Sequence, residues 1–192
     1  MNLVVGARGD QYEGWVSTER AGGAQLDIRQ ESDWRRYFAP GSIDRIVCEH
    51  VLEHMTFEDG FKALSNFRTF LKPGGFARIA VPDAHNPGEA YQQHSAPGGI
   101  WEWIRRNFLL GADEPGHIVH YDYSTLTRQI SRAGLSPRLL EWFDEAGRFH
   151  RQPWNVGDAP VKRYFNSPMN LHVYLPVHGF QNISLLVDAA KV

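Results

Sequence analysis

One stretch of the chain, residues 43–81, most constrains the fold. Its first part, Ile43–Cys48, is a short apolar run typical of a central strand that is covered on both faces. A helix is expected next, because Thr56 and the acidic residue three positions later form a capping pair, and apolar residues then recur at helical spacing. The helix should end at the Lys72–Gly75 turn, and a second strand should follow over Phe76–Val81. This order predicts a right-handed crossover between two parallel strands.

Other apolar runs extend the same alternation. Strands are expected over Leu3–Val5, Trp15–Thr18, Ala24–Ile28, Leu139–Phe143 and Ile183–Val187. Helices are expected over Ile100–Leu110 and over residues 124–133, with Ser124 as the cap and Gly134 as the terminating residue. The prediction is an α/β fold, a Rossmann-like sheet of mostly parallel strands with helices on both faces and an antiparallel last strand near the C-terminus.

The length of the chain favours one domain. With 192 residues, of which 42% are hydrophobic, there is enough apolar surface for one substantial core. We expect this domain to cover residues 1–192, with irregular insertions on the substrate side near residues 84–122 and 144–181. Residues 84–99 are rich in Asn, Pro, Gly, Gln and His, a composition that suits a loop over an active site.

Charge and composition exclude several kinds of partner. Twenty Lys and Arg residues against 22 Asp and Glu give a net charge of -2, so we expect no nucleic acid partner. No apolar run approaches the roughly 20 residues that span a bilayer, and the first residues lack the pattern of a signal peptide. The single cysteine, Cys48, cannot form an internal disulfide. We therefore expect a cytoplasmic protein without a membrane partner, while the oligomeric state is not predicted.

Three segments in fixed order carry a family resemblance. They are His50-Val51-Leu52-Glu53-His54, then Phe70–Gly75 after the expected helix, then Ile79–Asp83. Together they resemble class I S-adenosylmethionine-dependent methyltransferases, in particular the short methyltransferase type 11-like group that is often linked to sugar and cell-surface biosynthesis. The resemblance covers about residues 3–140, and a weaker match lies near the C-terminus. It implies S-adenosyl-L-methionine as cofactor and transfer of a methyl group to O or N of a small molecule or glycan precursor.

The turn after the first strand is where the resemblance places the methionyl part of the cofactor. The family pattern there is Gly-x-Gly, but the chain has Gly6, Ala7, Arg8 and Gly9, with arginine at the place of the second glycine. Two outcomes are open. Arg8 binds the cofactor carboxylate by a charge-assisted hydrogen bond, or it fills the pocket and abolishes binding. The second outcome would make the chain a non-catalytic binding or assembly module. The spacing of these glycines lacks the three-glycine fingerprint of nicotinamide-dependent dehydrogenases.

Four further residues are candidates for cofactor binding by the same resemblance. Glu19 stands where an acidic residue accepts the ribose hydroxyls, and its two oxygens retain that capacity. Asp27 and Ile28 stand at the adenine position, and His50 lies nearest to the expected methyl donor. For Glu19 and Asp27 the alternative is a solvated carboxylate at the end of a strand.

His117 and His120 are the candidate catalytic residues. Related methyltransferases carry a histidine and an aromatic residue in this stretch, beside the substrate. An imidazole with a pKa near ~6.5 is able to accept the proton that a hydroxyl or amine loses. The alternative for each is a loop histidine that is hydrogen-bonded to the backbone. His50, Glu53 and His54 also have the H-x-x-E-H spacing of a zinc site, but they begin where a strand ends and no motif supplies another ligand. We expect no metal.

Overall fold

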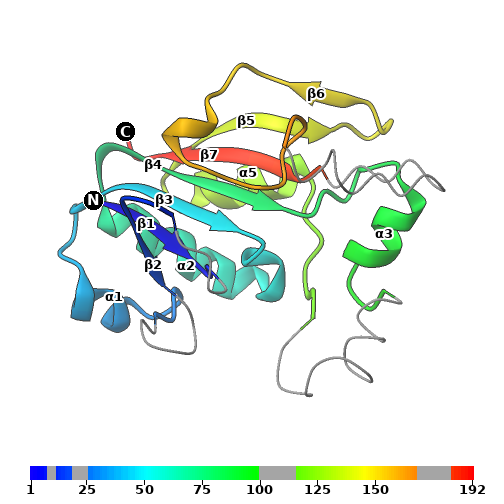
Figure 1. Cartoon of the computed structure of the whole chain (residues 1–192). Helices are drawn as coiled ribbons and strands as arrows, with labels where there is room; N and C mark the ends of the chain where they lie inside the picture. Colours follow the sequence, from blue (N-terminus) through cyan, green and yellow to red (C-terminus); the bar gives the residue numbers. More distant parts are fainter. Residues whose placement is uncertain (8–11, 19–25, 100–115, 168–182) are drawn as a thin grey trace.

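A seven-stranded sheet in the order β2-β1-β3-β4-β7-β5-β6 forms the centre of the described chain (Figure 1). The computed structural model describes residues 1–7, 12–18, 26–99, 116–167 and 183–192. The strands are β1 (Asn2–Val5), β2 (Trp15–Thr18), β3 (Ile43–Glu49), β4 (Leu71–Val81), β5 (Ser136–Phe143), β6 (Phe149–Arg151) and β7 (Leu185–Ala190). The helices are α1 (Glu31–Tyr37), α2 (Phe57–Phe70), α3 (Glu89–Ser95) and α5 (Tyr123–Arg132), with the 3₁₀ turns η1 (Leu52–His54) and η3 (Val156–Asp158).

The strand directions confirm the predicted sheet. β2, β1, β3 and β4 are successively parallel, whereas β7 is antiparallel to both of its neighbours, β4 and β5. β5 consequently runs in the same direction as β4, so five of the seven described strands point one way. The carboxyl ends of β1 and β3 therefore lie side by side at one edge of the sheet, the place where ligands bind in open α/β folds.

The two faces of the sheet are covered differently. Successive side chains of a strand alternate between faces, so Leu3 and Val5 pack with α1, α2 and α5, whereas Val4 lies on the opposite face. That opposite face is covered by the segment after β6, which contributes Trp154 and Tyr164, and no helix of the described residues packs there. Within the described residues, an aromatic-rich irregular segment supplies the apolar surface on this face.

The crossover from β3 to β4 follows its sequence signals closely. Thr56 caps α2 by accepting a hydrogen bond from the backbone N–H of Asp59 at 3.1 Å. β4 begins at Leu71, earlier than expected, because Leu71 pairs with Ile43 before the register shifts. Glycine is required at position 75, since a Cβ there would lie 2.9 Å from the carbonyl oxygen of Asp44. The expected turn over Lys72–Gly75 is therefore part of β4, at the register shift where β4 packs against β3.

Several local expectations need correction. Residues 26–28 lie outside any strand, because the Asp27 carboxylate accepts the backbone N–H of Arg29 at 3.0 Å and bends the chain. The helices α1 and α3 and the strand β6 were not expected, and α3 lies within the segment that was expected to be a loop. Asp122 caps α5 in place of Ser124, by accepting from the backbone N–H of Thr125 at 2.7 Å.

Other expectations are confirmed or lie outside the structure. Gly134 ends α5 with a positive φ of 77°, and the expected helix over Ile100–Leu110 falls outside the described residues. Among the described residues, no helix combines the length and the apolar composition needed to cross a bilayer.

Candidate functional site

A pocket of about 210 Å³ lies at the carboxyl ends of β1 and β3. Its lining comes from the end of β1 and the turn after it, from the end of β3, and from a distant segment: Val4, Val5, Gly6, Ala7, Tyr12, Val47, Glu49, His50, Lys162 and Arg163. Backbone and polar groups at this end of a parallel sheet are available to a ligand because no strand continues beyond them. It is the position that the family resemblance implies for the methionyl part of the cofactor.

The turn after β1 lines the pocket with main chain, because its residues Gly6 and Ala7 have no side chain or a very small one. Gly6 has a φ of 67°, and a Cβ on it would lie 2.6 Å from Cγ2 of Val51. Both the conformation and the contact require glycine. Ala7 is buried and donates its N–H to the carbonyl of Thr18 at 3.1 Å, which ties the turn to β2.

The opposite wall of the pocket is built by a segment far away in the sequence. The Glu49 carboxylate, at the end of β3, accepts the backbone N–H groups of Lys162 at 3.0 Å and of Arg163 at 2.9 Å. The carbonyl of Arg163 in turn accepts the N–H of Ser184 at 3.2 Å. These bonds place two cationic side chains against the pocket. No local pattern in the sequence relates residue 49 to residues 162 and 163, so sequence reasoning missed all three.

His50 joins the pocket to a buried polar cluster. It has a φ of 54°, and in the described chain it is the one residue other than glycine with a positive φ. Its Nδ1 lies 2.8 Å from Oε1 of Glu53, its Nε2 lies 2.9 Å from Oγ of Ser184, and its N–H donates to the carbonyl of Ala80 at 2.9 Å. Backbone strain of this kind persists only where surrounding contacts impose it, and it is concentrated at functional sites.

Glu53 is the buried carboxylate of this cluster. Its side chain is 0% exposed. Burial alone would raise the pKa of Glu53, but the charge and hydrogen bond of His50, together with the charges of His54 and His117, lower it below its usual value. The carbonyl of Glu53 accepts the N–H groups of Ile118 at 2.7 Å and Val119 at 3.1 Å, which bring His117 beside it. Sequence reasoning named Glu53 in the family motif and in the zinc pattern with His50 and His54, but not as a candidate site residue.

The two candidate catalytic histidines do not line the pocket. His117 lies beside His54, with ring centroids 4.9 Å apart, and its Nδ1 is 2.7 Å from the carbonyl oxygen of Ser95. His120 is half-buried, and its Nε2 lies 3.5 Å from Oγ of Ser95. Their catalytic role stays a prediction.

The other predicted cofactor residues are placed as follows. The Asp27 carboxylate pairs with Arg29 at 2.6 Å, and Ile28 is buried in the core. Neither contributes to the pocket lining, whereas Gly6, Ala7 and His50 do. Arg8, Gly9 and Glu19 lie outside the described residues.

His120 gives the folded state a pH dependence that is measurable. Burial, the largest cause, lowers the pKa of His120 to about 4, and His117 and His85 act in the same direction, while Asp122 and Glu53 oppose them. In the unfolded chain His120 becomes protonated as the pH falls below its ordinary pKa of 6.5. In the folded chain it stays neutral until the pH reaches about 4, so protons favour the unfolded state between these two values. The stability that neutral His120 provides is therefore complete above pH 6.5 and is lost as the pH falls toward 4.

The variant His120→Gln, which cannot titrate, should lose less stability than the parent between pH 7 and pH 4.5. Urea unfolding at the two pH values measures this difference. Burial raises the pKa of Asp83 to about 6 and gives a slope of opposite sign over the same interval, but Asp83 is common to both proteins and cancels in the comparison. An equal loss in parent and variant would show that His120 titrates normally.

Comparison with known proteins agrees with this geometry. The family model of a methyltransferase domain matches residues 8–140. The chain is similar in structure to a SAM-dependent methyltransferase from Archaeoglobus fulgidus, with a TM-score of 0.52 and 14% identity over 99% of this chain and 85% of that one. It is also similar to a possible histamine N-methyltransferase from Thermotoga maritima, with a TM-score of 0.53 and 10% identity over 100% and 82% of the two chains.

A third similar structure is the 1,6-didemethyltoxoflavin-N1-methyltransferase of Burkholderia thailandensis, with bound 1,6-didemethyltoxoflavin and S-adenosylhomocysteine. Its TM-score is 0.53 and its identity 12%, over 100% of this chain and 70% of that one. No curated protein sequence matches the chain. At these identities the structural likeness establishes the fold, and the family model establishes the family. The chain belongs to the methyltransferase-domain family, in the class I, S-adenosylmethionine-dependent group.

Proposed function

We propose that the chain binds S-adenosyl-L-methionine in the pocket between the ends of β1 and β3, and transfers its methyl group to O or N of a small molecule or glycan precursor in the cytoplasm. The observation that carries the proposal is that one pocket joins the glycine turn after β1, at Gly6 and Ala7, to His50 at the end of β3. The family uses this cofactor, and the sheet offers this position for it.

The residues around the pocket have distinct tasks in this proposal. The turn at Gly6 admits the cofactor close to the main chain. Lys162 and Arg163 are the cations that the structure places against the pocket, and either is suited to the cofactor carboxylate. His50, oriented through Glu53, lies where a proton leaving the acceptor would be taken up. His117 and His120 remain candidates for the same task, although the lowered pKa of His120 makes it a weak base at neutral pH.

The chemistry itself requires little from the protein. The sulfonium of the cofactor is a good leaving group, so alignment of acceptor, methyl and sulfur and exclusion of water provide most of the rate. We therefore expect binding residues to matter more than any single proton acceptor.

Calorimetric titration of the full chain with S-adenosylmethionine and with S-adenosylhomocysteine tests the proposal. Saturable binding is expected, with a thermal stabilisation that corresponds to about 2.7 kcal/mol at 100 times the dissociation constant. Arg163→Ala should weaken binding by about tenfold, because a charge-assisted hydrogen bond is lost, whereas the backbone N–H that Glu49 binds is retained. Arg148→Ala, at an exposed arginine remote from the pocket lining, is the matched control.

The alternative function is a non-catalytic binding or assembly module, and the arginine in the cofactor turn favours it. Replacing Arg8 with glycine separates the two. If the parent shows neither heat nor a thermal shift at millimolar ligand and Arg8→Gly creates affinity, the module is supported and the enzyme is not. If the parent binds, and Arg8→Gly binds equally or less well, the enzyme is supported.

A further inference from the structure

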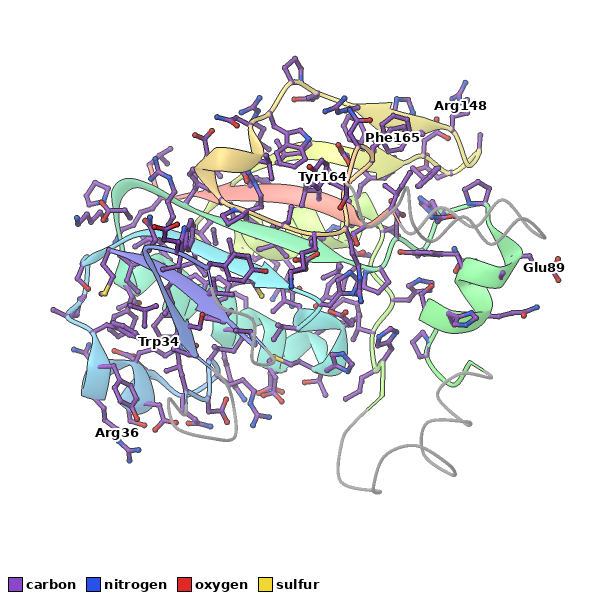
Figure 2. The ribbon with its side chains drawn as sticks, viewed as in Figure 1. Trp34, Arg36, Glu89, Arg148, Tyr164 and Phe165 are labelled. Carbon is purple, nitrogen blue, oxygen red and sulfur yellow. The ribbon has the colours of Figure 1, made fainter. Side chains whose placement is uncertain are left out.

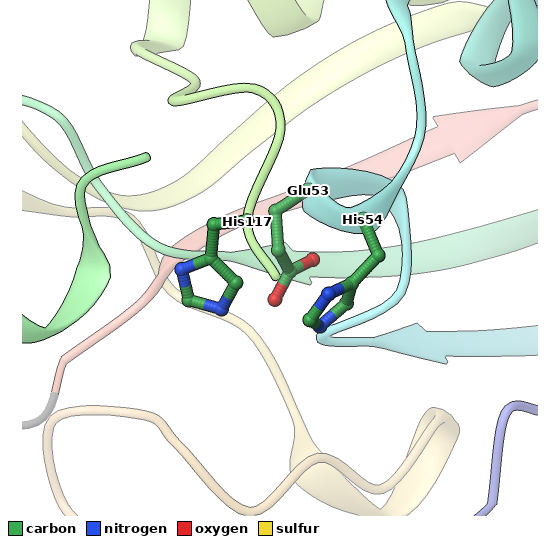
Figure 3. Close-up of side chains that lie close together, drawn as sticks. All are labelled: Glu53, His54 and His117. Atoms are coloured by element: carbon green, nitrogen blue, oxygen red, sulfur yellow. The ribbon is translucent and has the colours of Figure 1, made fainter. Parts of the chain in front are cut away.

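Three potential metal ligands converge behind the pocket. Glu53 and His54 belong to η1, directly after β3, and His117 belongs to the segment that leads to α5. One ligand atom of each lies within 4.8 Å of the others. Figure 3 shows the carboxylate of Glu53 between the two imidazole rings. The convergence is tertiary, since 63 positions of sequence separate His54 from His117.

The carboxylate of Glu53 lacks a normal set of partners. Both of its oxygens are buried, and apart from the contact of Oε1 with His50 neither has a hydrogen-bond partner among the residues that the structure describes. Oε1 lies 2.8 Å from Nδ1 of His50. A buried carboxylate is costly unless hydrogen bonds or a cation compensate it. The incomplete compensation of this buried carboxylate therefore points to a ligand of positive charge.

The two histidines make the Nδ1 hydrogen bonds that are usual for metal ligands. Nδ1 of His54 lies 3.1 Å from the carbonyl oxygen of Gly116, and Nδ1 of His117 lies 2.7 Å from that of Ser95. Because a carbonyl only accepts, each Nδ1 donates a proton, and in the neutral imidazole each Nε2 then bears a lone pair. An imidazole that binds a metal usually donates its other N–H to a carbonyl or a carboxylate in this way.

The main chain fixes these ligands relative to one another. The carbonyl of Glu53 accepts the N–H groups of Ile118 and Val119, so the backbone on either side of the cluster is joined. The ligand atoms lie within 4.8 Å of one another, whereas roughly 3.3 Å is expected around an occupied tetrahedral zinc. Metal binding would therefore bring the two rings and the carboxylate closer together than they are in this structure.

We propose that Glu53, His54 and His117 bind a divalent transition metal ion, in contrast to the sequence expectation of no metal. Two imidazole nitrogens and one carboxylate oxygen suit Zn²⁺, Co²⁺, Mn²⁺ or Fe²⁺ rather than Ca²⁺ or Mg²⁺, which take oxygen ligands. Three protein ligands leave coordination positions open, as in catalytic rather than structural sites.

The proposed metal site adjoins the proposed cofactor pocket. His50 both lines the pocket and contacts Glu53, so one residue separates the metal site from the cofactor site. An acceptor that reaches the methyl group from this side would present a hydroxyl or carboxylate oxygen to the metal. This assignment of the acceptor class rests on the proposed function, whereas metal binding itself does not.

The test uses the full chain, freed of metal by a chelator and then dialysed. Calorimetric titration with ZnCl₂, and absorption between about 500 and 650 nm on titration with CoCl₂, should show saturable binding of one ion per chain. His54→Ala and His117→Ala should each weaken this binding at least about tenfold, a loss of about 1.4 kcal/mol or more. His94→Ala, which removes an exposed histidine on α3, should leave it unchanged.

The following results would support or overturn the proposed metal site. Absence of saturable binding to the parent at millimolar Zn²⁺ and Co²⁺ overturns the proposal, and so does parent-like affinity in a folded His117→Ala variant. Glu53→Gln, which retains the shape of the side chain, keeps the test valid if an alanine variant does not fold. Binding of S-adenosylhomocysteine is measured separately: cofactor binding without metal binding refutes only the metal site, and metal binding without cofactor binding refutes only the proposed function.

Discussion

Replacing Arg78 with methionine is expected to lower the free energy of unfolding by roughly 3–5 kcal/mol, because it leaves a buried carboxylate without its counter-charge. Arg78 on β4 is 1% exposed and faces its register partner Asp188 on β7. Its Nε and Nη2 donate to the two oxygens of Asp188 at 2.8 and 3.0 Å. Its Nη1 donates to the carbonyls of Asn155 and Ala159 at 2.8 and 2.9 Å.

Urea unfolding at pH 7 measures this loss of stability. Two control variants test whether the loss comes from the buried charge pair. The double variant Arg78→Met/Asp188→Leu removes both charges, so it should recover much of the stability. Arg148→Met removes an arginine that is 76% exposed and pairs with Asp144 at 2.8 Å, and it should cost less than about 1 kcal/mol. A loss below 1 kcal/mol in Arg78→Met would contradict the assignment of Arg78 as the buried tie between β4 and β7.

Arg78 also holds the segment that leads to the pocket wall. The carbonyls that it binds belong to residues 155–159, and Lys162 and Arg163 follow a few residues later on the pocket wall. The ring of Trp154 lies 4.7 Å from its guanidinium and holds the same segment against the sheet. We therefore expect a folded Arg78→Met variant to bind cofactor more weakly than the parent.

Trp34→Ala should lower the free energy of unfolding by roughly 3–5 kcal/mol, since it empties a large volume in the core. Trp34 is 0% exposed and stacks on Phe70, with centroids 5.1 Å apart and planes at 21°. It also meets Phe67 edge-on at 5.8 Å. Figure 2 shows Trp34 turned inward from α1, whereas Arg36 on the same helix points to solvent.

Urea unfolding again gives the measurement, with Tyr37→Ala as a matched control on the same helix. Tyr37 is 54% exposed, so its removal should change stability by less than about 0.5 kcal/mol. Trp34→Phe should fall between the two, because it retains most of the volume but loses the bond from Nε1 to the carbonyl of Ile28 at 3.0 Å. If Trp34→Ala and Tyr37→Ala cost the same, α1 does not pack as described.

The elements that the sequence predicted best are those whose signals are local. The strands β1 and β3, the cap of α2 at Thr56 and the glycine at position 134 depend on residues within a few positions of each other. The same holds for Gly6, whose turn follows directly from the end of β1. The prediction was wrong where a short polar side chain competes with strand pairing for backbone hydrogen bonds. The Asp27 carboxylate accepts the backbone N–H of Arg29, and residues 26–28 lie outside any strand.

The site was predictable only in part, for the same reason. The motif at residues 50–54 indicated the family and placed His50 at the pocket, but it did not show that Glu53 would be buried beside His117. Nor did any spacing relate Glu49 to Lys162, since those residues meet only because the segment after β6 covers one face of the sheet. Non-local contacts of this kind depend on how layers pack, and periodicity along the chain carries no information about them.

By itself, then, the sequence determined the strand–helix–strand order, the glycine turn at the end of β1 and the methyltransferase family, because these follow from short-range periodicity, capping and motif. The tertiary structure alone decided that β7 lies between β4 and β5, that residues 162 and 163 form a wall of the pocket, and that two histidines converge on one buried carboxylate. The physical reason is that backbone preferences act over a few residues, whereas burial and charge compensation act between any residues that folding brings into contact.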